Sequence, residues 1–516
     1  MAHSEAHIAG EGEVNTRPRS KLLYNLNDIP PIKEALFVAL QHVCAIFIPI
    51  VTPGLLITGA LGLDSNKSSY ILGMALFVSG LGTFIQVNRL GPVGSGLLAV
   101  QGTSFAFVTP MLAIVVTSMH GSSPKTAEQT LSLILGLCFV GSFIPIILSR
   151  FLHLTRKIFT PLVTGTAVTL IGLCLIKVGM FYMAGGGKAK AIASKLPDSP
   201  QAFGSLQNWA LAMSVFGIVG VCSASSNRYL RMGSVIIGLL VGFIASVCLG
   251  IADFSQMSKL PLINIPIPFR FGIDFDFVTF IGFAIIYIAL TLEVLGDITA
   301  TSMVSGEPIE GRIFIRRLKG GILGDGVNSL IASILGSFPI VTPAQNNGII
   351  QLTGVGSRYV GYYIAGILTF LGLFPLVGGV LLAIPTSVFG GAVMLMFGTV
   401  AVAGFNILRE IEMDNRSFII LAISLASGLG VTFLPESLEH FPSGVRSVLG
   451  VLKIGTDFAI SCFIQVGAQL GGFFRHEHQT PQQYAGLLQD CAGAVLAQSR
   501  SSPAVELLHF VLFLIC

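Results

Sequence analysis

Apolar runs of about twenty residues recur from one end of the chain to the other. Each run is long enough to cross the hydrocarbon core of a membrane as a helix. Only 10% of the residues are charged, whereas a soluble domain usually carries about 25%. Such a chain has too few charges to cover a water-facing surface. The sequence therefore predicts an all-α polytopic protein of the lipid bilayer.

About fourteen runs are predicted, and they form two groups that meet near residue 265. The first group lies near residues 35–57, 69–88, 97–118, 129–149, 158–180, 207–224 and 232–252. The second lies near residues 277–297, 320–337, 338–357, 359–384, 386–407, 415–434 and 444–474. Because each half holds an odd number of segments, the two halves are expected to have opposite orientations in the membrane.

Basic residues follow every second predicted segment, as in the loops that contain Arg150, Arg228 and Arg316. Loops enriched in Lys and Arg normally face the cytoplasm, so the N-terminus is predicted to be cytoplasmic and the protein to lie in the cytoplasmic membrane. This distribution explains the net charge of +4 better than nucleic-acid binding does. Residues 1–34 lack the order of a cleaved signal peptide and are interpreted as a cytoplasmic arm.

Two segments are rich in Gly, Ser, Thr and Pro where a lipid-facing helix should be rich in Leu. They read "GSGLLAVQGTSFAFVTP" at 94–110 and "FPIVTPAQNNG" at 338–348, and each lies in the third segment of its half. Corresponding breaks in two halves are typical of inverted-repeat transporters. The sequence predicts one repeat over 35–265, a second over 266–474, and a site where the breaks meet. Residues 475–516 form a separate tail without an assigned role.

Both breaks mix β-branched, aromatic and hydroxyl residues, which suits short extended strands. Extended backbone facing lipid would leave N–H and C=O groups unpaired, so the breaks are expected to be buried in protein or to line a cavity. The two stretches could pair with each other and still offer free backbone groups to a ligand. The alternative is a pair of kinked helices that bind nothing.

Glu293 and Asp297 lie four residues apart, hence on one face of a predicted helix. Charged groups inside a membrane segment are costly and usually mark a substrate or proton pathway. A carboxylate can accept two parallel N–H bonds from a flat heterocycle. A purely structural role remains open for both residues, more readily for Asp297 than for the deeper Glu293.

Other polar residues lie in or near the predicted site. The carboxamide of Gln345 complements a purine or pyrimidine edge that carries C=O beside N–H. Asn346 and Asn347 could bind a ligand, although capping of a helix start is favoured. Asp325 could couple protons, brace the site or serve a local structural role. His42 is most simply a histidine packed in the helix bundle, or else it helps to shape the site.

Enzyme and metal chemistry are not indicated. The eight cysteines show no C-x-x-C spacing, and the sequence contains no metal-ligand pattern and no nucleophile–base pair. No metal or organic cofactor is therefore expected. We expect a transporter and not an enzyme.

Several ordered motifs resemble the nucleobase–ascorbate transporters, also called the second nucleobase:cation symporter family. The family signature is complete from Gln345 through Gly348 to Thr353 and Gly354. Further matches are Gln41-His42, "GTSFAF", the Glu293-x-x-x-Asp297 pair and "RRLKGGILGDGVNS". The resemblance covers about residues 22–440 and is closest to the bacterial xanthine permease branch.

The resemblance implies fourteen segments in two inverted repeats, core and gate domains, and a homodimer. It also implies proton symport of a purine nucleobase, with xanthine first and uric acid or uracil as alternatives. An anion exchanger of the same fold is a further alternative. Ile340 stands where the family often has Asn, which leaves selectivity among the bases open.

Site residues follow from the same resemblance. Glu293 and Gln345 would hold the purine ring through paired hydrogen bonds, while Ser104, Phe105 and Ala344 would line the site. The residues expected to couple protons or to brace the site are Asp325, Asp297, His42 and Asn346.

Overall fold

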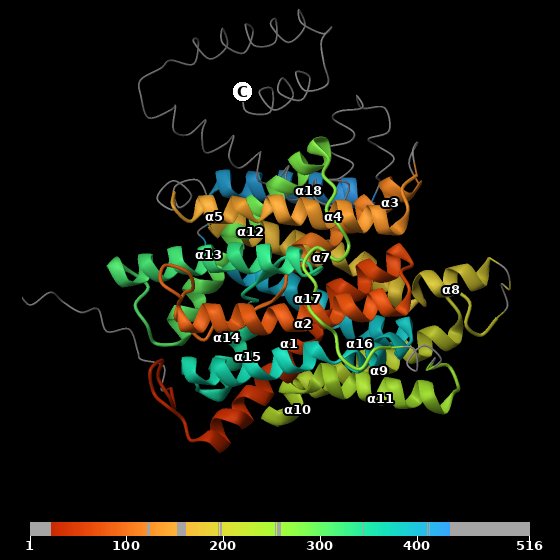
Figure 1. The fold of residues 1–516 in the computed structure, drawn as a ribbon, viewed down its shortest axis with the longest axis horizontal. Helices are drawn as coiled ribbons and strands as arrows, with labels where there is room; N and C mark the ends of the chain where they lie inside the picture. Colours follow the sequence, from red (N-terminus) through yellow and green to blue (C-terminus); the bar gives the residue numbers. More distant parts are fainter. Residues whose placement is uncertain are drawn as a thin grey trace, which may run out of the picture.

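The computed structural model describes residues 22–433 except for 121–123, 152–160, 195, 197–198, 253, 255–259, 344, 410 and 412. This part of the chain consists of helices and one two-stranded sheet. Several long helices, among them α2, α13 and α15, run roughly parallel to one another (Figure 1). The predicted all-helical architecture with two short strands is confirmed.

The first half follows the predicted order of segments. Its elements are α1 (Ile32–Leu61), α2 (Ser65–Asn88), β1 (Gly102–Thr103), a 3-10 helix η1 (Phe105–Phe107), α3 (Val108–His120), α4 (Ala127–Gly141), α5 (Phe143–Leu148), α7 (Pro161–Met183), α8 (Gly186–Ala193), α9 (Leu206–Ala224), α10 (Arg228–Met232) and α11 (Ser234–Cys248).

The second half begins with α12. Its elements are α12 (Phe277–Val304), α13 (Gly311–Ile334), β2 (Ile340–Val341), α14 (Gln345–Thr353), α15 (Arg358–Leu373), α16 (Pro375–Ala383), α17 (Thr386–Arg409) and α18 (Asn415–Phe433).

Six helices in the described ranges are long and apolar enough to cross a membrane, or up to seven if α15 and α16 form one bent span. The expected count of fourteen is therefore not confirmed. The predicted run 359–384 is bent by 75° between α15 and α16. Several other predicted runs are shorter apolar helices, such as α11, and the run 444–474 lies outside the described residues.

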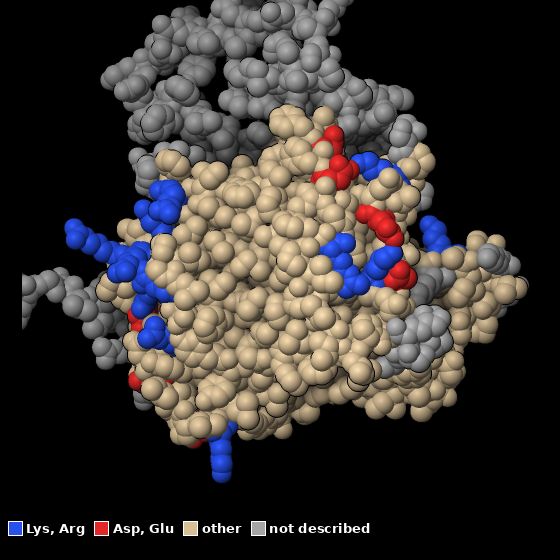
Figure 2. Space-filling model, in the orientation of Figure 1, with Lys and Arg blue, Asp and Glu red and all other residues tan. Residues whose placement is uncertain are grey.

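The visible surface agrees with a membrane protein. Charged side chains on this face lie mostly toward its edges and leave a broad uncharged area between them (Figure 2). Large apolar side chains are exposed on many helices, including Ile244, Phe370 and Phe418. A water-soluble protein would rarely expose apolar surface on this scale.

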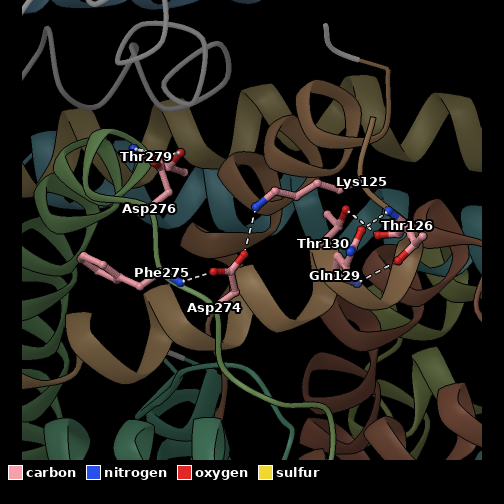
Figure 3. A network of polar contacts seen from close by, with 8 residues as sticks. All are labelled: Lys125, Thr126, Gln129, Thr130, Asp274, Phe275, Asp276 and Thr279. Carbon is pink, nitrogen blue, oxygen red and sulfur yellow. Dashed lines mark hydrogen bonds and ion pairs between the residues drawn. The ribbon is translucent and has the colours of Figure 1, made fainter. Parts of the chain in front are cut away.

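Two helices begin with side-chain caps, seen in Figure 3. At α4, Thr126 and Gln129 form a reciprocal capping box. At α12, Asp276 accepts a bond from the backbone N–H of Thr279 at 2.8 Å. Each cap satisfies orphan N–H groups of a first turn, so it fixes where these two helices start.

An exposed ion pair joins the same two helix starts. Lys125 Nζ lies 2.9 Å from Asp274 Oδ2 (Figure 3), and the Asp274 N–H donates to the Ser132 carbonyl at 3.1 Å. The hydrogen bond from Lys125, with further help from the N–H of Phe275, lowers the pKa of Asp274 against the opposing effect of partial burial. We call Lys125 and Asp274 the surface latch.

Residues 22–28, which belong to the predicted N-terminal arm, are attached to the second half. Tyr24 forms a parallel bridge with Val355, and the Gly356 N–H donates to the Tyr24 carbonyl at 2.9 Å. The Ser357 hydroxyl donates to the Asp28 carbonyl at 2.6 Å. Helix α1 then begins at Ile32, slightly before the predicted apolar run.

Two large apolar cores surround the sheet. One gathers residues of α1, α15 and α17, and the other gathers residues of α3, α4 and α12. Val100, just before β1, belongs to the first core, whereas Val341 of β2 belongs to the second. The strands therefore lie between the cores, deep in the fold.

Candidate functional site

The two broken segments meet as an antiparallel pair. Gly102 faces Val341 and Thr103 faces Ile340, and the Ser104 N–H extends the pairing by donating to the Pro339 carbonyl at 2.9 Å. Both strands are buried. The pairing predicted for these stretches is thus confirmed, and we call this element the strand crossing.

Hydroxyl side chains link the strand crossing to neighbouring helices. The Thr103 hydroxyl donates to the Ile50 carbonyl of α1 at 2.8 Å. Ser329 of α13 accepts from the Ile340 N–H at 3.2 Å and donates to the Ile340 carbonyl at 3.0 Å. Lipid offers no hydrogen-bond partners to an irregular backbone. Hydroxyl groups of the protein supply such partners here, so the buried strands are tolerated.

A chain of amides lies beside the strand crossing. Gln101 donates from Nε2 to the Thr342 hydroxyl at 2.8 Å, and its Oε1 accepts from Asn328 Nδ2 at 3.2 Å. Gln86 of α2 donates to the Gly321 carbonyl at 2.9 Å and accepts from the Ser95 N–H at 2.9 Å. The amides thereby join α2, α13 and both broken segments.

Asp325 belongs to this network. It is buried on α13, where its carboxylate accepts from Gln86 Nε2 and, over 3.4 Å, from the Thr342 N–H. Its partners are thus a side-chain amide of α2 and a backbone amide of the second broken segment. This geometry supports the bracing role among the roles left open for Asp325.

The first broken segment continues into η1 and α3. Ser104 is buried and caps η1 by accepting from the Ala106 N–H at 3.3 Å. Phe105 is the first residue of η1, and its ring meets Phe397 of α17 edge-on, with centroids 5.8 Å apart. These two predicted lining residues therefore lie between the strand crossing and α17.

The second broken segment continues into α14, which begins at Gln345. Asn346 donates from Nδ2 to the Leu98 carbonyl at 2.7 Å, and Asn347 Oδ1 accepts from the Thr301 hydroxyl at 2.6 Å. These bonds to other segments differ from the helix-capping role that the sequence favoured. Ala344 lies outside the described residues.

Helix α12 carries the two acids predicted from their spacing. Glu293 and Asp297 are partly buried, and α12 packs against both η1 and α14. Asp297 and Glu293 interact electrostatically, as do Asp297 and Asp325. The structure thus places the three predicted acids of α12 and α13 within electrostatic range of one another.

Helix α1 adds Gln41 and His42, and it packs against β1 and α14. His42 Nδ1 lies 3.0 Å from the Val38 carbonyl, which can only accept, so Nδ1 is the donor of this bond. Within the described residues, His42 Nε2 and both polar atoms of Gln41 are buried without a hydrogen-bond partner.

Further buried atoms on α12 and α14 share this property. Asp297 Oδ2 and Asn346 Oδ1 have no hydrogen-bond partner among the described residues. Buried polar atoms are normally satisfied, so such atoms on helices around one crossing are typical of a ligand site. In the described ranges, no group of three His, Cys, Asp or Glu residues could hold a metal ion.

The sequence interpretation missed Gln86, Gln101 and Asn328 as contributors to this region. Each is a buried amide in a membrane segment or a break. Polar side chains are rare inside membrane segments, and this rarity is the signal that could have identified them. The bonds that join the two halves could not be named from sequence, because their partners lie more than 200 residues apart along the chain.

Comparison with known proteins identifies the family. A sequence model described as "Permease family" matches residues 33–437. The xanthine permease XanQ of Escherichia coli K12 is 46% identical over 430 residues, which are 83% of this chain and 89% of the relative. The xanthine permease XanP of the same organism is 39% identical over 435 residues, 83% and 91% of the two chains. A putative purine permease of Clostridium perfringens is 35% identical over 427 residues, which are 83% of this chain and 89% of the relative.

Solved structures share the fold. The transmembrane domain of the cyanobacterial bicarbonate transporter BicA gives a TM-score of 0.50 at 13% identity and covers 86% of this chain and 99% of that chain. The murine Solute Carrier 26 family member A9 gives a TM-score of 0.50 at 12% identity and covers 84% of this chain and 68% of that chain. At such identities the likeness concerns the fold alone. The family and relatives are permeases and not enzymes, and the chain belongs to the nucleobase–ascorbate transporter family of integral membrane permeases.

Proposed function

We propose that this permease imports a purine nucleobase, with xanthine as its first substrate, together with a proton. The observation that carries the proposal is the match to xanthine permeases over 83% of the chain. The strand crossing supports it, since unpartnered polar atoms of α1, α12 and α14 lie on helices that pack around one another. A flat heterocycle with several N–H and C=O groups would satisfy such atoms.

In this proposal, Glu293 and Gln345 hold the purine edge, while Ser104, Phe105 and Ala344 line the site. The position of Phe105 against Phe397 supports an aromatic wall for the ring. Asp325, Asp297, His42 and Asn346 couple protons or brace the site. The nearness of Asp297 to Glu293 and Asp325 supports the proton role, because a proton held by one of these acids relieves their mutual repulsion.

We also propose the arrangement in the membrane. Residues 35–265 and 266–474 would form inverted repeats, the N-terminus would face the cytoplasm, and two chains would form a homodimer. Antiparallel pairing of one short strand from each half supports the inverted relationship. The alternation of basic loops along the sequence supports the orientation.

Uptake of radiolabelled xanthine by cells that lack their own purine and pyrimidine permeases tests the proposal. Expression of this chain should give saturable uptake that a protonophore abolishes. Unlabelled uric acid and uracil, added as competitors, rank the alternative substrates. Failure to take up xanthine, uric acid, uracil or any other base would refute the proposed function, and uptake that a protonophore leaves intact would refute the proton coupling.

A further inference from the structure

We infer that Gln101 is a positioning residue for transport, which holds the start of α14 in place through the hydroxyl of Thr342. This inference rests on the proposed function, because it concerns the geometry of the same site. Gln101 directly precedes β1 and Thr342 directly follows β2. The antiparallel register that pairs Gly102 with Val341 sets these two residues opposite each other.

The direction of the hydrogen bonds fixes how the Gln101 amide is turned. Asn328 Nδ2 donates to the Gly82 carbonyl at 3.3 Å and to Gln101 Oε1 at 3.2 Å. A carbonyl can only accept, so the Asn328 nitrogen must face both oxygens. The Gln101 nitrogen then faces Thr342 Oγ1, 2.8 Å away. The chain of bonds from α2 through α13 therefore ends at the residue that leads into α14.

The backbone of Gln101 is also fixed. Its N–H donates to the Thr83 hydroxyl at 2.9 Å, and the Thr83 hydroxyl donates to the Ser79 carbonyl of its own helix at 2.7 Å. Gln101 is thus anchored to α2 through its main chain, and its side chain accepts from Asn328 of α13, which also donates to the Gly82 carbonyl of α2. Thr342 lies three residues before Gln345, the first residue of α14.

Burial explains why the contact matters. Gln101, Asn328 and Thr342 are all fully buried, so loss of the Gln101 amide would leave partners without water to replace it. One donor and the acceptor of Gln101 are already engaged by protein groups. We therefore place its action on the position of α14 and of Gln345, and not on direct contact with the base.

The test compares Gln101→Leu, Thr342→Val and the double variant in the xanthine uptake assay. Gln101→Leu should raise the KM about tenfold, as expected when buried partners lose their hydrogen bonds. Thr342→Val, which keeps the side-chain shape, should raise the KM in the same direction. Because both changes remove the hydrogen bond between Gln101 and Thr342, the double variant should be less affected than the product of the two single effects.

Thr58→Val is the matched control. Its hydroxyl is equally buried but donates to Gly54 in its own helix at 2.7 Å, so the KM should not change. The amount of each variant in the membrane is measured on the same cells. A purely structural role for Gln101 would lower this amount and the maximal rate without shifting the KM or the relative inhibition by uric acid.

Three outcomes would overturn the inference: an unchanged KM in Thr342→Val, an unchanged KM in a membrane-inserted Gln101→Leu, or multiplicative effects in the double variant. Should Gln101→Leu fail to reach the membrane, Thr342→Val decides alone. Absence of uptake by the unaltered protein would instead refute the proposed function. The two failures are therefore distinguishable.

Discussion

The strand crossing and the surface latch both use acids to hold distant segments together, but their partners differ. In the crossing, the buried Asp325 accepts from the Gln86 amide and from a backbone N–H. In the latch, the exposed Asp274 pairs with Lys125. Water screens the latch, whereas it cannot replace a lost partner in the crossing. Substitution of a buried acid near the strand crossing should therefore affect uptake or stability far more than substitution of an exposed charged residue.

The largest effect is expected from Glu293→Gln. In the proposed site, the carboxamide keeps the side-chain shape but loses charge-assisted bonds to the base, and it cannot carry a proton. Loss of two such bonds at about 1.5 kcal/mol each corresponds to roughly a hundredfold fall in uptake efficiency. Initial rates of xanthine uptake give the measurement.

Glu34→Gln is the control for that change. Glu34 is exposed and accepts a bond from the Tyr24 hydroxyl at 2.6 Å, so the same substitution there should leave uptake nearly unchanged. Equal effects on uptake at both positions would contradict the expectation that a buried acid matters more than an exposed one. Unchanged kinetics in Glu293→Gln would remove that residue from the site.

A smaller effect is expected from Gly324→Ala, which tests the packing of the crossing without changing charge. A Cβ at Gly324 would lie 2.8 Å from Gln86 Nε2, and Gln86 is held by bonds to three groups. Overpacking at such a site usually costs about 1–3 kcal/mol. Thermal melting of the detergent-purified protein should therefore occur at a lower temperature.

Gly366→Ala provides the comparison, since a Cβ at Gly366 in α15 would meet nothing within 4 Å. Alanine favours a helix over glycine, so the melting temperature should stay the same or rise slightly. Equal destabilisation by both substitutions would show that the Gln86 contact is not the cause.

The smallest effect is expected from Lys125→Met in the surface latch. Exposed ion pairs contribute less than about 1 kcal/mol, so melting near neutral pH should change little. The pair lowers the pKa of Asp274 in the folded protein, so its contribution is present above the unfolded pKa and is lost as the pH falls through the folded pKa. The difference between Lys125→Met and the unaltered protein should therefore begin to shrink below about pH 4 and disappear once the pH is below the lowered pKa of folded Asp274. A difference that grows on acidification would contradict this sign.

Much of the fold could be predicted from local patterns. The two breaks were identified because Gly, Pro and hydroxyl residues interrupt apolar runs, and their pairing is observed at Gly102 and Val341. The number of membrane-spanning segments was harder to predict from the sequence. Proline and glycine mark a bend, but only packing decided that the run 359–384 turns by 75° between α15 and α16.

The acids of the candidate site were also accessible, since Glu293, Asp297 and Asp325 stand out in apolar surroundings. The hydrogen-bond partners of the polar residues could not be predicted from the sequence. Asn346 bonds to Leu98 and Asn347 to Thr301, although a local cap seemed simpler from sequence. Hydrogen bonds between residues far apart in the chain depend on how helices pack, which local spacing does not encode.

By itself, the sequence determined the solvent in which this protein folds, the places where its helices break and the family to which it belongs. These follow from composition, local propensity and a motif of adjacent residues. Only the tertiary structure decided that Gln86, Gln101 and Asn328 join the two breaks. Directed bonds of this kind need donor and acceptor within about 3 Å, a condition that only the packing of whole helices can meet.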